Sequence, residues 1–150
     1  IKNNSGKEKI MYILKTECSF DSAHFLSGYQ GKCSNLHGHR WRIVLEVMTD
    51  ELCTDTQHNG MYVDFGDLKK DLKAKGDELD HSLIIEKGSL KENTLQALKE
   101  ENFRILEFDF RPTAENFAEY FFDEMKKCGY NIKAVTVYET PNNAATYTEN

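Results

Sequence analysis

One short segment of this chain combines residue types that commonly bind metals. It reads Cys33-Ser34-Asn35-Leu36-His37-Gly38-His39, and His24 precedes it. Alternate residues of a β-strand point to the same face, so His37 and His39 would share a face, roughly 6–7 Å apart at the backbone. Three imidazoles leave a fourth position open on zinc, as is typical of catalytic rather than structural sites. His24, His37 and His39 are therefore candidate metal ligands.

Cys33 and a distant acid–histidine pair are candidates for proton transfer. A cysteine near a cation or a histidine can become a thiolate, although a free cysteine is often only a small buried hydrophobic residue. In Asp80-His81, a carboxylate bonded to an imidazole would fix its tautomer and its role as a base. Neighbours in an extended segment point in opposite directions, so the partner of Asp80 stays open. The alternative for this pair is a helix cap and a surface histidine.

Three further polar residues could bind a ligand near such a site. Glu139 ends an apolar run, and one carboxylate can accept two parallel hydrogen bonds from the edge of a nitrogen-rich ring. The alternative for Glu139 is a solvated charge at a strand end. Thr113 follows Pro112 as a helix N-cap, and Glu115 would either complement the helix dipole or act as a second anchor.

Two segments with strand-like alternation must position the histidines. Residues 12–20 alternate, and so do residues 37–48. In the second segment the apolar residues share the parity of His37 and His39, so the metal-binding face and the apolar face are predicted to be one face. These apolar residues are Trp41, Ile43, Leu45 and Val47.

The rest of the pattern predicts an α+β fold with an antiparallel four-stranded sheet and helices on one face. Helices are expected from about residue 67, with a stripe of Leu68, Leu72 and Leu79, around 92–101, and from Thr113 to Cys128-Gly129. Strands are expected over 130–139 and 144–148, joined by a turn at 141–143. Residues 49–60 are expected to form a loop, ending in Asn59-Gly60, in which Cys53 and His58 have no functional role.

Bulk properties exclude several classes of partner. The 150 residues predict one domain, residues 11–150, after a flexible tail over residues 1–10. A net charge of −6 argues against nucleic acids and anionic membranes. No apolar run is long enough for a membrane span, and four cysteines without paired spacing favour a reducing cytoplasm. A hydrophobic content of 39% predicts a small core that is completed in a homo-oligomer.

Taken in order, the motifs resemble the 6-pyruvoyltetrahydropterin synthase family. The matching segments are 20–24, 32–39, 63–68, 79–81, 112–116 and 137–140. The resemblance implies the family's tunnelling fold, in which subunits join their sheets into a barrel and commonly form hexamers. Segments 49–60 and 88–104 depart from the compact family pattern.

The resemblance also assigns roles and a pterin substrate. It implies zinc bound by His24, His37 and His39, catalysis by Cys33 with Asp80 and His81, pterin anchoring by Glu139, and a pocket lined by Thr113 and Glu115. The family's usual substrate is 7,8-dihydroneopterin triphosphate. One branch forms 6-pyruvoyltetrahydropterin, and another also releases acetaldehyde to give 6-carboxytetrahydropterin for queuosine synthesis.

The spacing of Cys33 and His37 resembles the 6-carboxytetrahydropterin branch, because the pyruvoyl branch typically has two more residues between these positions. Two alternatives remain beside this assignment. One is the pyruvoyl reaction, and the other is a non-catalytic pterin-binding module in which the metal is structural.

Overall fold

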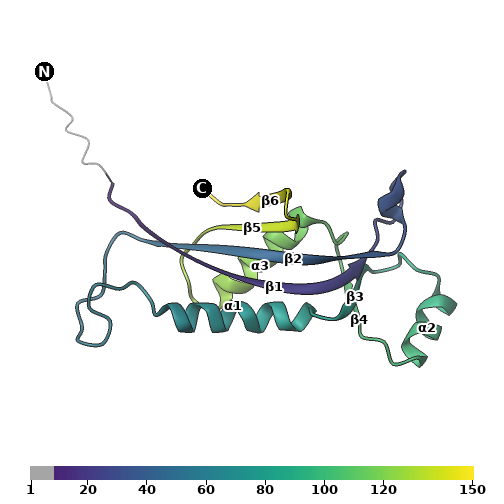
Figure 1. The fold of residues 1–150 in the computed structure, drawn as a ribbon, viewed down its shortest axis with the longest axis horizontal. Helices are drawn as coiled ribbons and strands as arrows, with labels where there is room; N and C mark the ends of the chain where they lie inside the picture. Colours follow the sequence, from purple (N-terminus) through teal and green to yellow (C-terminus); the bar gives the residue numbers. More distant parts are fainter. Residues whose placement is uncertain (1–8) are drawn as a thin grey trace, which may run out of the picture.

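The computed structural model describes residues 9–150, and six strands and three α-helices form its architecture (Figure 1). In chain order the elements are β1 (Tyr12–His24), the short 3-10 helix η1 (Lys32–Ser34), β2 (His37–Thr49), α1 (Phe65–Leu79), β3 (Ser82–Glu86), α2 (Glu92–Glu100), β4 (Ile105–Phe108), α3 (Ala114–Lys127), β5 (Ile132–Thr140) and β6 (Asn143–Tyr147). Of the expected tail over residues 1–10, all but the last two residues lie outside the described residues. Within residues 9–150, no helix combines the length and the apolar character that a membrane crossing requires.

The sheet has the strand order β4-β3-β1-β2-β5-β6 and is mixed. Strands β1, β2, β5 and β6 are antiparallel, as expected, but β3 pairs in parallel with β1 and with β4. The expectation of a four-stranded, fully antiparallel sheet is therefore wrong. The two additional strands are short, and β3 is a continuous apolar run, Leu83-Ile84-Ile85, without the alternation that marks a half-exposed strand.

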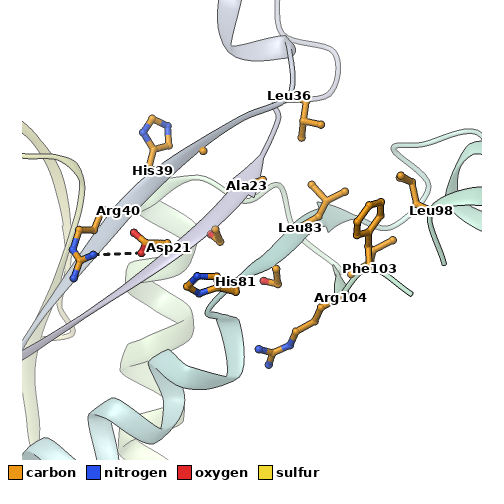
Figure 2. Close-up of a pocket in the computed structure, with 14 residues that line it drawn as sticks. Asp21, Ala23, Leu36, His39, Arg40, His81, Leu83, Leu98, Phe103 and Arg104 are labelled. Atoms are coloured by element: carbon orange, nitrogen blue, oxygen red, sulfur yellow. Dashed lines mark hydrogen bonds and ion pairs between the residues drawn. The ribbon is translucent and has the colours of Figure 1, made fainter. Parts of the chain in front are cut away.

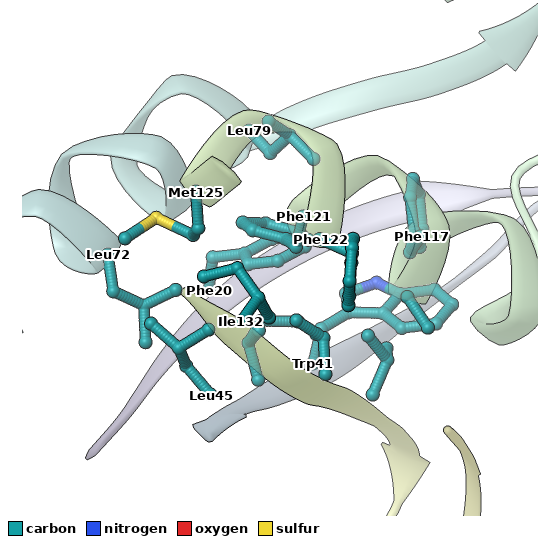
Figure 3. Close-up of a cluster of buried hydrophobic side chains, with 14 of the residues drawn as sticks. Phe20, Trp41, Leu45, Leu72, Leu79, Phe117, Phe121, Phe122, Met125 and Ile132 are labelled. Carbon is teal, nitrogen blue, oxygen red and sulfur yellow. The ribbon is translucent and has the colours of Figure 1, made fainter. Parts of the chain in front are cut away.

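Helices α1 and α3 cover one face of the sheet, as the sequence predicts. They enclose a single core in which the two helices meet the inward side chains of β1, β2 and β5 (Figure 3). Its largest fully buried side chains include Phe20, Trp41, Ile43, Leu45, Leu68, Leu72, Phe117 and Phe121. Each such side chain contributes about 1.5–3 kcal/mol through burial, so this layer rigidly supports the face that carries the histidines.

The ends of α3 follow the sequence prediction closely. The Thr113 hydroxyl oxygen accepts a hydrogen bond from the Asn116 backbone N–H at 3.2 Å, which caps the first turn. Gly129 has a φ of +96° just after the helix, the left-handed conformation that glycine adopts readily. The predicted helix over 92–101 also forms as α2, which lies near the β3–β4 end of the sheet and apart from α1 and α3 (Figure 1).

Candidate functional site

The register of the β1–β2 hairpin brings the three predicted ligands together. His24 lies directly opposite His37, and Ser22 lies opposite His39. One potential ligand atom from each histidine lies within 4.8 Å of those of the other two. The predicted shared face is confirmed, because Trp41 follows His39 on the same side of β2 and its ring lies against both His24 and His39.

Backbone carbonyl groups determine which nitrogen of His24 and His37 carries the proton. The Nδ1 atom of His24 lies 2.7 Å from the Pro112 carbonyl oxygen, and the Nδ1 atom of His37 lies 2.7 Å from that of Asn35. A carbonyl oxygen only accepts hydrogen bonds, so Nδ1 is the donor in both rings. In each neutral ring the Nε2 atom therefore presents a lone pair.

These two lone pairs face each other. The Nε2 atoms of His24 and His37 are 3.1 Å apart, and two unprotonated nitrogens cannot hydrogen-bond to one another. A cation between them would remove the repulsion, and two nitrogens on a tetrahedral zinc ion would be about 3.3 Å apart at ordinary Zn–N distances. The donor arrangement therefore fits a divalent metal ion, with the carbonyls orienting the ligands as is usual for metal-bound histidines.

Burial favours the neutral form of His24 and His39, and several buried polar atoms around them lack hydrogen-bond partners. Removal from solvent lowers the pKa of His24 to about 4, and it also lowers the pKa of His39, which the Glu139 carboxylate partly opposes. Neutral imidazoles are the form that binds metals. The buried side-chain atoms that lack a hydrogen bond in residues 9–150 are Ser22 Oγ, His39 Nε2 and Trp41 Nε1. All three lie on this hairpin face, so the unmet polar groups gather where an ion and its ligands would bind.

Glu139 lies beside the histidine cluster. One of its carboxylate oxygens is 3.4 Å from His39 Nε2. Both residues line a cavity of about 460 Å³, together with Arg42, Tyr138 and Thr140. Glu139 therefore lies next to the histidine cluster at the border of this cavity.

Asp80 and His81 contact each other directly, which the sequence left open. His81 Nδ1 lies 2.7 Å from one Asp80 carboxylate oxygen, and the other carboxylate oxygen accepts the Asp21 backbone N–H at 2.8 Å. The contact between neighbours forms because His81 has a left-handed φ of +52°. Hydrogen bonds from Asp21 and then from His81 hold the pKa of Asp80 below its usual range, so the carboxylate stays charged and fixes the imidazole with Nε2 free.

His81 of this pair lines a second cavity, of about 690 Å³ (Figure 2). Apolar side chains form much of its lining, including Leu36, Leu83, Leu98 and Phe103. The His39 backbone borders this cavity, but its ring projects from β2 away from Leu83 and Phe103 (Figure 2). No hydrogen bond within residues 9–150 joins His81 to the three clustered histidines. The pair and the cluster therefore face different spaces within one chain.

Comparison with known proteins identifies the family. Residues 13–150 match the family model described as 6-pyruvoyl tetrahydropterin synthase. The chain belongs to this family. It is 34% identical to the 6-carboxy-5,6,7,8-tetrahydropterin synthase of Haemophilus influenzae over 142 residues, covering 93% of this chain and all of that protein. It is 37% identical to the protein of the same name from Rickettsia bellii, covering 82% of this chain and 90% of that protein.

Two solved structures share this fold. The family member from Caenorhabditis elegans has a TM-score of 0.65 at 25% identity, covering 94% of this chain and 97% of that one. An uncharacterized protein from Wolinella succinogenes has a TM-score of 0.75 at 20% identity, covering 94% and 99%. The family model and the curated relatives confirm the resemblance inferred from the motifs.

The remaining predicted site residues do not join the histidine cluster. Cys33 lies in η1, in the connection between the ends of β1 and β2 that carry His24 and His37, and it is partly buried. Thr113 follows Pro112, whose carbonyl orients His24, but its hydroxyl caps α3. Glu115 is exposed in the first turn of α3. It forms no side-chain hydrogen bond or ion pair with residues 9–150.

Two kinds of site residue were missed by sequence reasoning. The carbonyls of Asn35 and Pro112 act through the backbone, so no residue type signals them. Arg111 donates to the Ser27 carbonyl, and the Asn116 side chain donates to the Arg111 carbonyl at 2.9 Å. These contacts hold the segment that presents Pro112, and only the Pro-Thr-Ala-Glu-Asn motif hinted at its importance.

Proposed function

We propose that this chain is a zinc-dependent enzyme of pterin metabolism. Its reaction would convert 7,8-dihydroneopterin triphosphate and water into 6-carboxytetrahydropterin, acetaldehyde and triphosphate, on the route to queuosine. The observation that carries the proposal is the pair of oriented Nε2 lone pairs of His24 and His37, 3.1 Å apart beside His39. The relatives named 6-carboxy-5,6,7,8-tetrahydropterin synthases support the choice of product, and the short spacing from Cys33 to His37 supports it as well.

Each candidate site residue would have its own role in the reaction. Bound zinc would polarise the substrate side chain and acidify its C–H and O–H groups. Glu139, on the cavity wall beside His39, would accept hydrogen bonds from the pterin edge. Thr113 and Glu115 would line the same substrate site. Cys33 would exchange protons with the substrate.

His81 is proposed as the second proton carrier. Its Nε2 atom is free because Nδ1 is bonded to Asp80, and its ring is largely exposed. Proton transfer by a positioned group contributes about 10²–10⁴-fold to a rate. Because His81 and the clustered histidines face different spaces within one chain, the proposal includes a homo-oligomer in which copies meet at the site.

An exposed apolar surface supports the oligomer, which we propose to be a hexamer. Tyr12, Ile13, Met61 and Phe65 are all more than 40% exposed, and they border a cavity of about 460 Å³ between the start of β1 and the segment before α1. Exposed apolar patches of this kind mark protein interfaces. The four unpaired cysteines fit the proposed reducing cytoplasm.

Product analysis tests the proposed reaction. The purified protein, loaded with zinc and given 7,8-dihydroneopterin triphosphate, should release triphosphate and acetaldehyde and yield 6-carboxytetrahydropterin by mass spectrometry. Accumulation of 6-pyruvoyltetrahydropterin without trapped acetaldehyde would assign the chain to the other branch. Binding of a pterin without turnover would favour a binding module.

The role of Glu139 predicts a loss of substrate affinity in Glu139→Gln. The amide keeps the shape of the side chain but replaces one acceptor oxygen by a donor, so affinity should fall by about 1.5–3 kcal/mol, the range for a hydrogen bond to a charged group. Calorimetry with 7,8-dihydroneopterin measures this loss. The same measurement on Glu115→Gln shows which of the two glutamates contributes more to the affinity for the pterin. Unchanged binding in Glu139→Gln would place the ring elsewhere.

A further inference from the structure

Arg104 forms a fan of hydrogen bonds to the end of α1. Its Nη1 atom donates to the Asp80 carbonyl at 2.7 Å and to the Asp77 carbonyl at 3.3 Å, and its Nη2 atom donates to the Glu78 carbonyl. Arg104 lies in the segment between α2 and β4, more than twenty residues away in sequence. Its backbone is anchored too, since its carbonyl accepts the Leu83 N–H at 2.9 Å.

The end of α1 needs such a partner. The last carbonyl oxygens of a helix lack N–H donors within the helix, and a positive charge there interacts favourably with the helix dipole. The last turn of α1 contains no basic residue. The Arg104 guanidinium supplies both the charge and the donors. Its two terminal nitrogens bind three carbonyl oxygens, a geometry that the single ammonium nitrogen of a lysine matches less well.

The carbonyls bound by Arg104 immediately precede a backbone conformation that is costly to maintain. His81 is one of two non-glycine residues with positive φ in residues 9–150. A side chain held in this conformation costs on the order of 1–3 kcal/mol unless its surroundings stabilise it. The His81 N–H donates to the Asp21 carbonyl at 2.7 Å, and Arg104 holds the carbonyl of Asp80 on the other side. The turn is thus held from both sides.

We propose that Arg104 is a positioning residue for His81. By binding the carbonyls of Asp77, Glu78 and Asp80, it maintains the left-handed turn in which His81 Nδ1 donates to Asp80 and Nε2 remains free as the proton acceptor. This inference rests on the proposed function for its catalytic consequence, but the orientation of His81 can be measured without turnover.

Arg104→Ala and Arg104→Lys test the proposal in the zinc-loaded full chain. Long-range ¹H–¹⁵N spectra of ¹⁵N-histidine-labelled protein, at a pH where the ring is neutral, report which nitrogen of His81 carries the proton. The wild type should show a single Nδ1–H tautomer, and Arg104→Ala should show a mixture. In the proposed reaction kcat should fall about tenfold to a hundredfold, the cost of small misplacements of catalytic groups, while KM and zinc content remain unchanged.

Lys87→Ala is the matched control, because it removes a surface cation just after β3 whose side chain, within residues 9–150, pairs only with Asp109, at 3.0 Å. It should match the wild type in every measurement. If Arg104→Ala does not fold, Arg104→Lys provides the test. Lysine keeps the positive charge but not the several N–H donors of the guanidinium, so this variant should still show a mixture of His81 tautomers. A wild-type tautomer signature in the folded variants overturns the proposal. A mixed tautomer in an enzyme whose wild type lacks the proposed turnover would support the positioning role and refute the proposed function.

Discussion

Replacing His37 by alanine is expected to remove both bound zinc and catalytic turnover. The change deletes one of three nitrogen donors and its oriented Nε2 lone pair, so zinc affinity should fall by more than about 100-fold, beyond the loss typical for a residue that only supports a ligand. Elemental analysis should show about one zinc per wild-type chain and close to none in the variant. His37 suits this test better than His24, which is only 1% exposed and whose removal would also disturb the core.

His58→Ala is the matched control for this experiment. His58 lies in the loop before α1, where its side chain hydrogen-bonds, within residues 9–150, only to Asp55, and its removal should change neither zinc content nor rate. Full activity in a metal-free preparation of the wild type would contradict the proposed metal chemistry. Retention of zinc by a folded His37→Ala protein would show that the ion binds elsewhere.

The second large effect is expected from Cys33→Ala. If the Cys33 thiol exchanges protons with the substrate, its loss should lower kcat by about 10²–10⁴-fold, the usual contribution of a general acid or base. Zinc content and the thermal midpoint should stay close to those of the wild type, since Cys33 is only partly buried and contributes its backbone carbonyl, not its side chain, to the hydrogen bond with Leu26. Steady-state kinetics together with metal analysis measure both quantities.

Two other cysteines make this test specific. Cys128→Ala removes an exposed thiol at the end of α3 and should leave kcat unchanged. Cys18 is a poor candidate for the catalytic thiol because burial raises its pKa to about 11, which keeps it protonated near neutral pH. A Cys33→Ala enzyme with a near-normal kcat would reduce Cys33 to a packing residue.

Periodicity predicted the parts of the fold that alternate or end in a cap. The parity of Trp41 with His37 and His39 correctly located the shared face, and Thr113 and Gly129 correctly bounded α3. Strands β3 and β4 were missed because they are four or five residues long and pair in parallel. A short buried run of this kind has no period by which to distinguish it from a loop or a helix fragment.

The sequence predicted which residue types form the candidate site, but not how the histidine rings are oriented. His-x-His and the preceding His24 indicated a metal site, yet their tautomers depend on carbonyls that any residue carries. The Asp80–His81 contact depends on a left-handed φ at a histidine, where sequence reasoning expects glycine or asparagine. Arg104 acts on this turn from a distant segment, so its role required the three-dimensional structure.

The main-chain origin of the acceptors for His24 and His37 bears on how this site tolerates sequence change. A side-chain acceptor can be lost in one substitution, whereas the carbonyls of Asn35 and Pro112 survive any substitution that preserves the backbone path. Substitutions at these two positions should therefore leave His24 and His37 correctly oriented. The corresponding vulnerability is geometric: an insertion or deletion between β1 and β2, or just before α3, would displace an acceptor without altering a single histidine.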